Sequence, residues 1–245
     1  MKTRMNNVVK ASPIGAHLRE LKWRVFASLV CFFMFFAISA YYGSQIYAFL
    51  ALPLKDLDSN ITMIYTAMGE GFMVQIRVAL YAAVFASIPF WLYQLYRFIA
   101  PGLRKTEKNV ALPCFLLSPI LFLLGASFLY YFVMPVLWKF FMSFQIQNAD
   151  NSILLYAKIS EYLSLCLSLA LSFGLSFQLP VVVIILSKCG VVTTQGLRKK
   201  RKYAIVLIFM LAAVLTPPDV ISQICLAIPL LLLYEISIIL SKIFK

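Results

Sequence analysis

The sequence has few of the residues that enzymes use for acid–base and metal chemistry. It contains one histidine, His17, and nine acidic residues. Its five cysteines are far apart, with no Cys-x-x-Cys pair, so they are better explained as small apolar packing residues than as a metal or redox site. A protease acting within a membrane needs a histidine near its nucleophile or metal, and His17 precedes every apolar segment. We expect a protein that is not an enzyme and has no metal or cofactor.

Long polar stretches are also missing. The chain of 245 residues is 62% hydrophobic and only 13% charged, which is far from the composition of soluble domains. A helix needs about 20 mostly apolar residues to cross the hydrocarbon core of a bilayer. Four runs meet this requirement, and a further apolar region is divided by Thr216-Pro217-Pro218-Asp219, where two prolines favour a turn outside the lipid.

The pattern therefore predicts an all-α integral membrane protein with six transmembrane helices. The expected spans are about 25–42, 78–96, 110–138, 162–187, 203–215 and 221–240. We expect the fifth and sixth helices to be short, since residues 203–215 would extend only about 20 Å as a helix. Prolines inside the spans predict kinked helices in a concave arrangement: Pro89, Pro113, Pro119, Pro135, Pro180 and Pro229.

Positive charge is concentrated on one side of the predicted membrane. The net charge is +13, and all but four of the 22 Lys and Arg residues fall in the N-terminal segment, the second and fourth loops, or the C-terminal tail. Because short cytoplasmic loops carry the excess of Lys and Arg, both termini are predicted to be cytoplasmic. Basic residues confined to membrane loops indicate anionic lipid headgroups as partners and argue against nucleic acid. The exceptions are Lys55, Arg77, Lys139 and Lys158.

The organisation is that of one membrane domain, 1–245, without internal repeats. Residues 1–24 are predicted to form a cytoplasmic amphipathic lead-in, because Leu18 and Leu21 share one helical face. On the outer side, the long loop of about 43–77 is predicted to fold as a cap, since it contains Pro53 and the Gly69-Glu70-Gly71 stretch.

Two acids, Glu20 and Glu107, stand on the otherwise basic inner face. Glu20 has two interpretations: an ion pair with Arg24 one helical turn later, or a carboxylate that receives a cationic ligand. Glu107 also has two: an acid in a first helical turn capped by Thr106, or a ligand-binding group held by the Pro101-Gly102 loop. Taken together, two acids on a basic face suit the binding of two guanidinium groups.

Three polar residues lie within or beside the later spans: Gln178, Glu235 and Asp219. An acid inside a membrane helix is a candidate functional residue, although a hydrogen-bonded structural role for Glu235 is equally compatible with the sequence. Gln178 is expected to bond a neighbouring helix or to line a hydrated cavity. A proton-coupled transporter of small solutes, working through Glu235, is the alternative function, but it predicts repeats around a midplane site.

Four segments in this order and topology resemble the TatC family of twin-arginine translocase subunits over nearly the whole chain. They are HLRELKWR at 17–24, FIAPGLRKTE at 98–107, LRKKRKY at 197–203 and LTPPDVISQ at 215–223. The sequence departs from the family in two places. Lys22 stands where the family motif usually has Arg, and Gln178 stands where some members have a membrane-embedded Glu.

The resemblance implies a core translocase subunit that is the receptor for twin-arginine signal peptides. It would nucleate a translocon that exports folded proteins using the proton motive force, in a bacterial inner (plasma) membrane or an organellar inner membrane. The implied signal-peptide site comprises Glu20, Glu107, Phe98, Leu21 and Pro101. Residues around Val214, Thr216 and Gln223 would contact the single-span proteins TatA and TatB, and other TatC copies are further implied partners.

Overall fold

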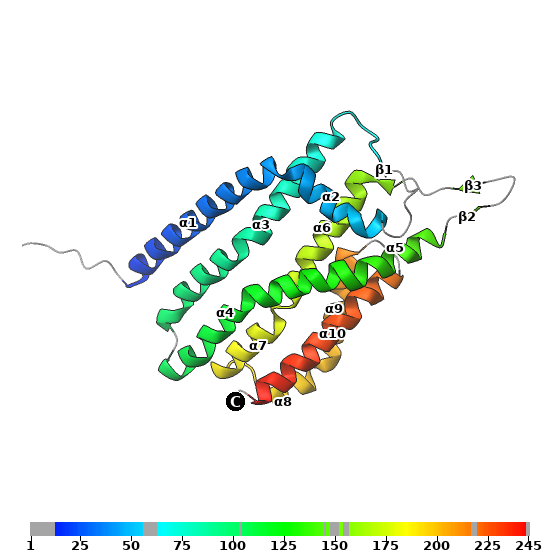
Figure 1. Ribbon diagram of the computed structural model, residues 1–245. Helices are drawn as coiled ribbons and strands as arrows, with labels where there is room; N and C mark the ends of the chain where they lie inside the picture. Colours follow the sequence, from blue (N-terminus) through cyan, green and yellow to red (C-terminus); the bar gives the residue numbers. More distant parts are fainter. Residues whose placement is uncertain are drawn as a thin grey trace, which may run out of the picture.

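The computed structural model describes residues 13–55, 63–102, 104–144, 146–147, 152–153, 157–216 and 220–243. Helices make up almost all of this part of the chain (Figure 1). Five helical segments are long and apolar enough to cross a membrane, and they confirm the predicted all-α multi-pass membrane protein. These segments are His17–Tyr41, Glu70–Gly102, Lys108–Met142, Ile159–Lys188 and Val220–Lys242.

The first two spans form a pair at one side of the bundle. Helix α1 (Pro13–Tyr41) packs along α3 (Glu70–Ile99), and the indole N–H of Trp91 donates to the carbonyl of Ser28 between them. The lead-in and the first span are one continuous helix, because Pro13 stands at its start, where proline is tolerated, and no breaker follows within it. Residues 1–12 of the predicted lead-in lie outside the described residues.

The third span is a single helical unit containing one irregular turn. Helix α4 (Lys105–Phe128) continues through the π-helix η2 (Leu129–Val133) into α5 (Met134–Met142). The prolines inside α4 do not end it. This unit crosses the centre of the molecule in Figure 1 and packs against α6.

The fourth span is divided, whereas the sequence predicted one helix over 162–187. Helix α6 (Ile159–Ser176) ends before Phe177 and Gln178, and α7 (Leu179–Lys188) continues to the inner side. The break occurs where Pro180 lacks the N–H that a continuous α-helix would donate to the carbonyl of Ser176.

The last two spans differ in length, which corrects one expectation. Helix α8 (Thr194–Lys199) precedes α9 (Arg201–Leu215), whose 15 residues extend about 22 Å, so the fifth span is short as predicted. Helix α10 (Val220–Ile243) has 24 residues, or about 36 Å, so the prediction of a short sixth helix was wrong. Pro229 lies inside α10 without ending it, and the helix continues past the predicted end at residue 240 to Ile243.

The bundle centre depends on two glycines where α4 meets α6. A Cβ atom added to Gly174 would lie 2.5 Å from the ring of Phe122, and one added to Gly125 would lie 2.6 Å from the carbonyl oxygen of Phe173. Neither distance is compatible with a real side chain. The missing Cβ atoms therefore allow the two helices to approach closely at this point.

The outer end carries a folded cap, as the loop composition predicted. It contains helix α2 (Gly43–Lys55) and strand β1 (Met63–Ile64), which pairs in parallel with β4 (Ala157–Lys158). A second two-stranded pair joins β2 (Ile146–Gln147) to β3 (Ser152–Ile153). The cap thus links the segment before α3 to the segment before α6.

Glu70 is the central acid of this cap. Its carboxylate accepts hydrogen bonds from the backbone N–H groups of Thr66 at 2.6 Å and Ala67 at 3.2 Å, and from the Thr66 hydroxyl at 3.0 Å. It also accepts from the N–H of Ser160 at 3.3 Å, at the start of α6. The Glu70 residue is only 8% exposed, so this carboxylate fastens the first turn of α3 to α6.

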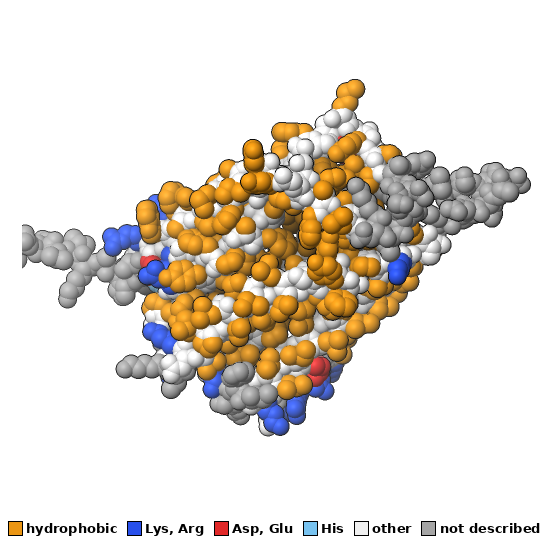
Figure 2. Space-filling view, viewed as in Figure 1, with side chains coloured by type: hydrophobic (Ala, Val, Ile, Leu, Met, Phe, Trp, Pro, Cys, Tyr) orange, Lys and Arg blue, Asp and Glu red, His pale blue; other side chains and the backbone are white. Residues whose placement is uncertain are grey.

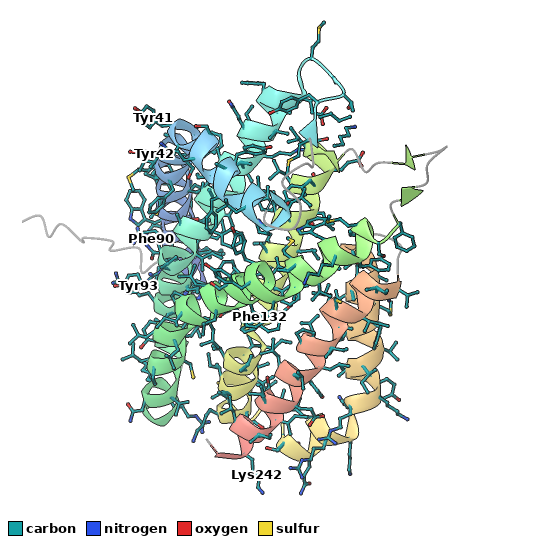
Figure 3. All side chains as sticks on the ribbon, turned by 45° about the vertical axis from the view of Figure 1, so that its right-hand side comes forward. Tyr41, Tyr42, Phe90, Tyr93, Phe132 and Lys242 are labelled. Carbon is teal, nitrogen blue, oxygen red and sulfur yellow. The ribbon has the colours of Figure 1, made fainter. Side chains whose placement is uncertain are left out.

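The surface has a broad apolar part and a basic end, as the charge pattern predicts (Figure 2). Hydrophobic side chains cover most of the face in Figure 2, while Lys and Arg gather near the first residues of α1 and around α8 and the end of α10. Figure 3 shows the exposed side chains of Tyr41 and Tyr42 at the end of α1, with Lys242 at the opposite end of the bundle on α10. Both described ends of the chain lie at the basic end of the bundle (Figure 1).

Candidate functional site at the inner face

Glu20 lies one helical turn before Arg24 on α1, and the two side chains form an ion pair. The Arg24 Nε donates to Glu20 Oε1 at 3.1 Å, and Arg24 Nη2 contacts the same oxygen more closely. The second oxygen, Oε2, lies 3.8 Å from His17 Nδ1, which is longer than a hydrogen bond. The Glu20 side chain is 38% exposed, so its carboxylate is partly open to solvent despite the ion pair.

Arg24 connects this acid to the end of α3. Its Nη1 donates to Gln94 Oε1 at 3.1 Å, and its Nη2 donates to the carbonyl of Arg97 at 3.3 Å. The guanidinium is therefore shared between α1 and α3, and its side chain is only 14% exposed. Gln94 and the Arg97 carbonyl hold Arg24 beside Glu20.

Phe98 forms the wall next to this acid. Its ring stacks on the imidazole of His17, with centroids 4.3 Å apart and an angle of 17° between the rings. Because His17 also faces Glu20, the structure brings Phe98 and Glu20 to the same site, as the resemblance implied. Leu21 is exposed on the next turn of α1.

A groove of about 700 Å³ lies on this side of α1. It combines the carboxylate of Glu20 with two basic side chains and a stacked aromatic pair, Trp23 and Phe26, whose ring centroids are 5.7 Å apart. Trp23 is strongly exposed. The groove can therefore bind an extended segment that carries both cationic and apolar side chains. Its lining residues are Arg19, Glu20, Lys22, Trp23 and Phe26.

Pro101 and Glu107 follow Phe98 along the chain. Pro101 is exposed in the 3₁₀ turn η1 (Ala100–Gly102), directly after α3. Glu107 is the third residue of α4, and its side chain lies outside the described residues. The first bond of this helix runs from Lys108 N to the Arg104 carbonyl, so Arg104 occupies the N-cap position and the expectation of a Thr106 cap was wrong.

The residues implied for partner contacts do not form one exposed patch. Val214 is 83% exposed on α9. Thr216 is buried, and its hydroxyl donates to the Ala212 carbonyl at 2.9 Å. The Gln223 amide donates to the Phe209 carbonyl at 3.1 Å, so Gln223 joins α10 to α9. Val214 is thus exposed on the side of α9, while Thr216 bonds within the last turn of α9 and Gln223 joins α10 to α9.

The intramembrane polar residues are engaged in bonds within the protein. Gln178 donates its side-chain amide to the Ser118 carbonyl of α4 at 3.0 Å, which confirms the expected bond to a neighbouring helix. Glu235 forms an ion pair with Arg201, the first residue of α9, at 2.6 Å. Its environment is therefore that of a paired acid near the inner ends of the helices. Asp219 lies outside the described residues.

Some residues of the inner site were not predicted from the sequence. Gln94 and the Arg97 carbonyl both bind Arg24, which lies about 70 positions earlier in the sequence. Helical periodicity does not predict contacts between residues so far apart. His17 was noted only as a residue outside the membrane, yet it stacks on Phe98. Within the described ranges no cluster of three or more His, Cys, Asp or Glu side chains that could hold a metal ion occurs.

Comparison with known proteins gives a consistent result. The family described as "Sec-independent protein translocase protein (TatC)" matches residues 16–229. A TatC protein of Rickettsia prowazekii is 45% identical over 228 residues, covering 92% of this chain and 91% of its own. The TatC protein of Escherichia coli is 34% identical over 239 residues, covering 97% of this chain and 91% of its own. A crystal structure of a twin-arginine translocase receptor, TatC, superposes with a TM-score of 0.82 at 36% identity, covering 93% of this chain and 99% of the other.

Proposed function

Since the chain belongs to the TatC family of Sec-independent protein translocase proteins, we propose that its inner-face site binds the arginine pair of a twin-arginine signal peptide. The protein is a receptor subunit of Sec-independent protein export, and family membership confirms the prediction that it is not an enzyme. The observation that carries the proposal is the contact of Glu20 with a guanidinium, that of Arg24, beside an exposed groove.

The geometry around Glu20 supports binding of a second guanidinium. A carboxylate has about four lone-pair sites, and Arg24 uses those of Oε1, so Oε2 is available to a ligand. Arginine suits this position better than lysine, because its planar fork can form two parallel bonds to a carboxylate. The Phe98 ring and the Trp23–Phe26 pair offer apolar surface for the residues next to the arginines.

Glu107 is proposed as the acid for the second arginine. Its backbone lies in the first turn of α4, five residues after the η1 turn that follows Phe98. Pro101 and Leu21 complete the surface between the two acids in this proposal. The partial positive charge at the α4 N-terminus keeps an acid there ionised, which favours a cationic ligand.

Photo-cross-linking tests this proposal. The full-length protein in nanodiscs is incubated with a synthetic signal peptide that has a photoreactive residue beside its arginine pair. Glu20→Gln and Glu107→Gln should each lower the cross-linked fraction by about tenfold, as expected when a charge-assisted bond is lost. Glu161→Gln is the matched control, because Glu161 is an exposed acid of the outer end. Labelling of both inner variants at the wild-type level would contradict the proposal.

The proposal extends to partners and location. We place the protein in a bacterial inner membrane, with TatA and TatB, other copies of this chain and anionic lipids as partners. The exposed Val214 on the short helix α9 supports contact with a single transmembrane helix. Val214→Cys should form a disulfide with a cysteine in the outer half of a TatB helix. Val136→Cys, at another exposed position on α5, should not.

The transporter alternative has less support. It requires an acid that can exchange protons near the middle of the membrane. Glu235 is instead paired with Arg201, at the beginning of α9.

A further inference from the structure

A mostly apolar cavity of about 550 Å³ lies between α2, α3, α4 with η2, and α6, on the outer half of the bundle. Its α3 wall runs from Val78 to Pro89, within the predicted second span, so the cavity is at the depth of the lipid tails. In Figure 1, α2 lies across the outer parts of α3 and α6, above the α4–η2–α5 unit. The cavity is separate from the inner-face groove, since the two share no lining residue.

Pro53 shapes the roof of this cavity. Because proline has no N–H, the carbonyl of Phe49 lacks its usual donor within α2. The Tyr130 hydroxyl donates to this carbonyl at 2.8 Å, and the Tyr162 hydroxyl donates to the carbonyl of Leu50 at 2.7 Å. The rings of Phe49 and Tyr130 also stack, 4.7 Å apart and 3° from parallel. The two tyrosine hydroxyls are therefore bonded to the roof, while both residues line the cavity.

The π-helix η2 shapes the opposite wall. Its five residues interrupt the α-helical ladder between α4 and α5, and such turns are frequent at functional sites. Leu129, Tyr130 and Tyr131 of this turn all line the cavity. One extra residue in a turn rotates the following side chains by about 100° relative to a regular α-helix. Two departures from regular helix, one in α2 and one in η2, thus meet at the same cavity.

The volume of the cavity and its mostly apolar lining indicate which kind of molecule it can hold. At about 30 Å³ per molecule, this volume corresponds to roughly 18 waters, each needing two to four polar partners, and apolar cavities lack those partners. A helix about 10 Å wide needs a broad groove, whereas a single acyl chain is much thinner and fits a narrower space between packed helices. Leu123 and Tyr131 line the cavity and are also exposed on the surface of the bundle, so the cavity is open on that side.

We propose that this cavity binds one acyl chain of a phospholipid from the outer leaflet. The lipid chain enters between α3 and α4 and lies under α2, against the aromatic rings of Tyr130 and Tyr162. Without an occupant, the side chains that line the cavity would lack van der Waals contacts on that side, and the acyl chain supplies these contacts. The proposal concerns a site away from the signal-peptide groove and does not depend on the role of Glu20 or Glu107.

Photolabelling with a lipid tests the site. The full chain is placed in vesicles of phosphatidylethanolamine and phosphatidylglycerol containing a phosphatidylcholine with a diazirine on one acyl chain. Mass spectrometry should find label concentrated on cavity-lining residues. Ala82→Trp, which fills the cavity from α3, should lower this labelling about tenfold, with Ala82→Phe as a smaller filler if the tryptophan variant does not fold. Ala37→Trp, on the exposed face of α1, is the matched control and should leave the labelling unchanged.

Two outcomes would overturn the proposal. Label spread evenly over all lipid-facing helices, with no effect of either filler, would show that the cavity holds no particular chain. Displacement of the lipid by the apolar part of an added signal peptide, with the peptide then labelling the same residues, would assign the cavity to the cargo. Thermal unfolding of each variant separates loss of the lipid site from loss of the fold.

Discussion

Two carboxylates at opposite ends of the bundle, Glu70 and Glu20, are held by different kinds of hydrogen-bond partner. Glu70 is almost completely buried. Four groups donate hydrogen bonds to its carboxylate, and three of them are backbone N–H groups, whose positions are set by the fold. Glu20 is more than a third exposed, and its strongest partner is the flexible side chain of Arg24. The first acid is bound by the fold itself. The second is bound by a guanidinium, the same group that an arginine ligand would offer, and this difference is why Glu20 is proposed as the binding acid.

The largest effect is expected for Glu70→Gln. The amide NH₂ of glutamine would face N–H donors where the carboxylate accepted, and buried donors would be left without a partner. The melting temperature of the protein in nanodiscs, followed by tryptophan fluorescence, should fall by about 5 °C or more. Glu161→Gln, at an exposed acid of the same end, should change it by less than about 1 °C. An unchanged melting temperature for Glu70→Gln would remove the distinction between the two acids.

Glu20→Gln should show the opposite pattern. We expect binding of a twin-arginine peptide to weaken about tenfold, with a melting temperature within about 2 °C of the wild type, because exposed ion pairs contribute little to stability. Glu20→Asp keeps the charge but shortens the side chain, and it should weaken binding about threefold. Isothermal titration calorimetry measures both variants. If Glu20→Gln unfolds the protein instead, Glu20 is a second structural acid.

Arg24→Lys should give a smaller and opposite change in binding. Lysine keeps the positive charge but cannot donate to Glu20, Gln94 and Arg97 together, so it competes less well for the Glu20 carboxylate. Peptide affinity should rise about threefold, while the melting temperature should fall by about 2 °C as the link to α3 weakens. Weaker binding would mean that Arg24 positions Glu20 and does not occupy the ligand's place.

Salt should produce the smallest effect. Raising the ionic strength from about 0.05 to 0.5 M screens exposed charges, so peptide affinity at the inner site should fall about twofold to threefold in the wild type. The hydrogen bonds of the buried Glu70 carboxylate are poorly screened by salt, so the melting temperature should change by less than about 1 °C. If salt lowered the melting temperature as clearly as it lowered peptide affinity, Glu70 and Glu20 would be in similar environments.

The sequence predicted the parts of the fold that depend on local patterns. Apolar runs located the five long spans, because crossing lipid demands a continuous apolar surface. The same reasoning located the short α9, and the spacing of Glu20 and Arg24 gave their ion pair. The prediction of a single membrane domain over 1–245 stays a prediction.

Other features could not be predicted because they depend on contacts between distant segments. Pro135, two residues after η2, predicted a kink but not a π-helix, and the sequence offers no sign that Tyr130 bonds α2. Glu70 was one of several acids of the outer loops, and only the fold shows that it holds α3 to α6. The break after Ser176 is caused by Pro180, but prolines inside α4 and α10 cause no break, so proline alone is ambiguous.

The bond between Glu70 and Ser160 also has a consequence for the far end of α3. It fixes the outer ends of α3 and α6 to each other, with the β1–β4 pair beside it. Helix α3 has 30 residues, a rigid arm of about 45 Å, so a tilt of 1° about its outer end displaces its inner end by about 0.8 Å. The inner end of this arm carries Arg97 and Phe98. In the proposed binding mode, a small tilt of α3 would therefore displace the residues that contact the signal peptide.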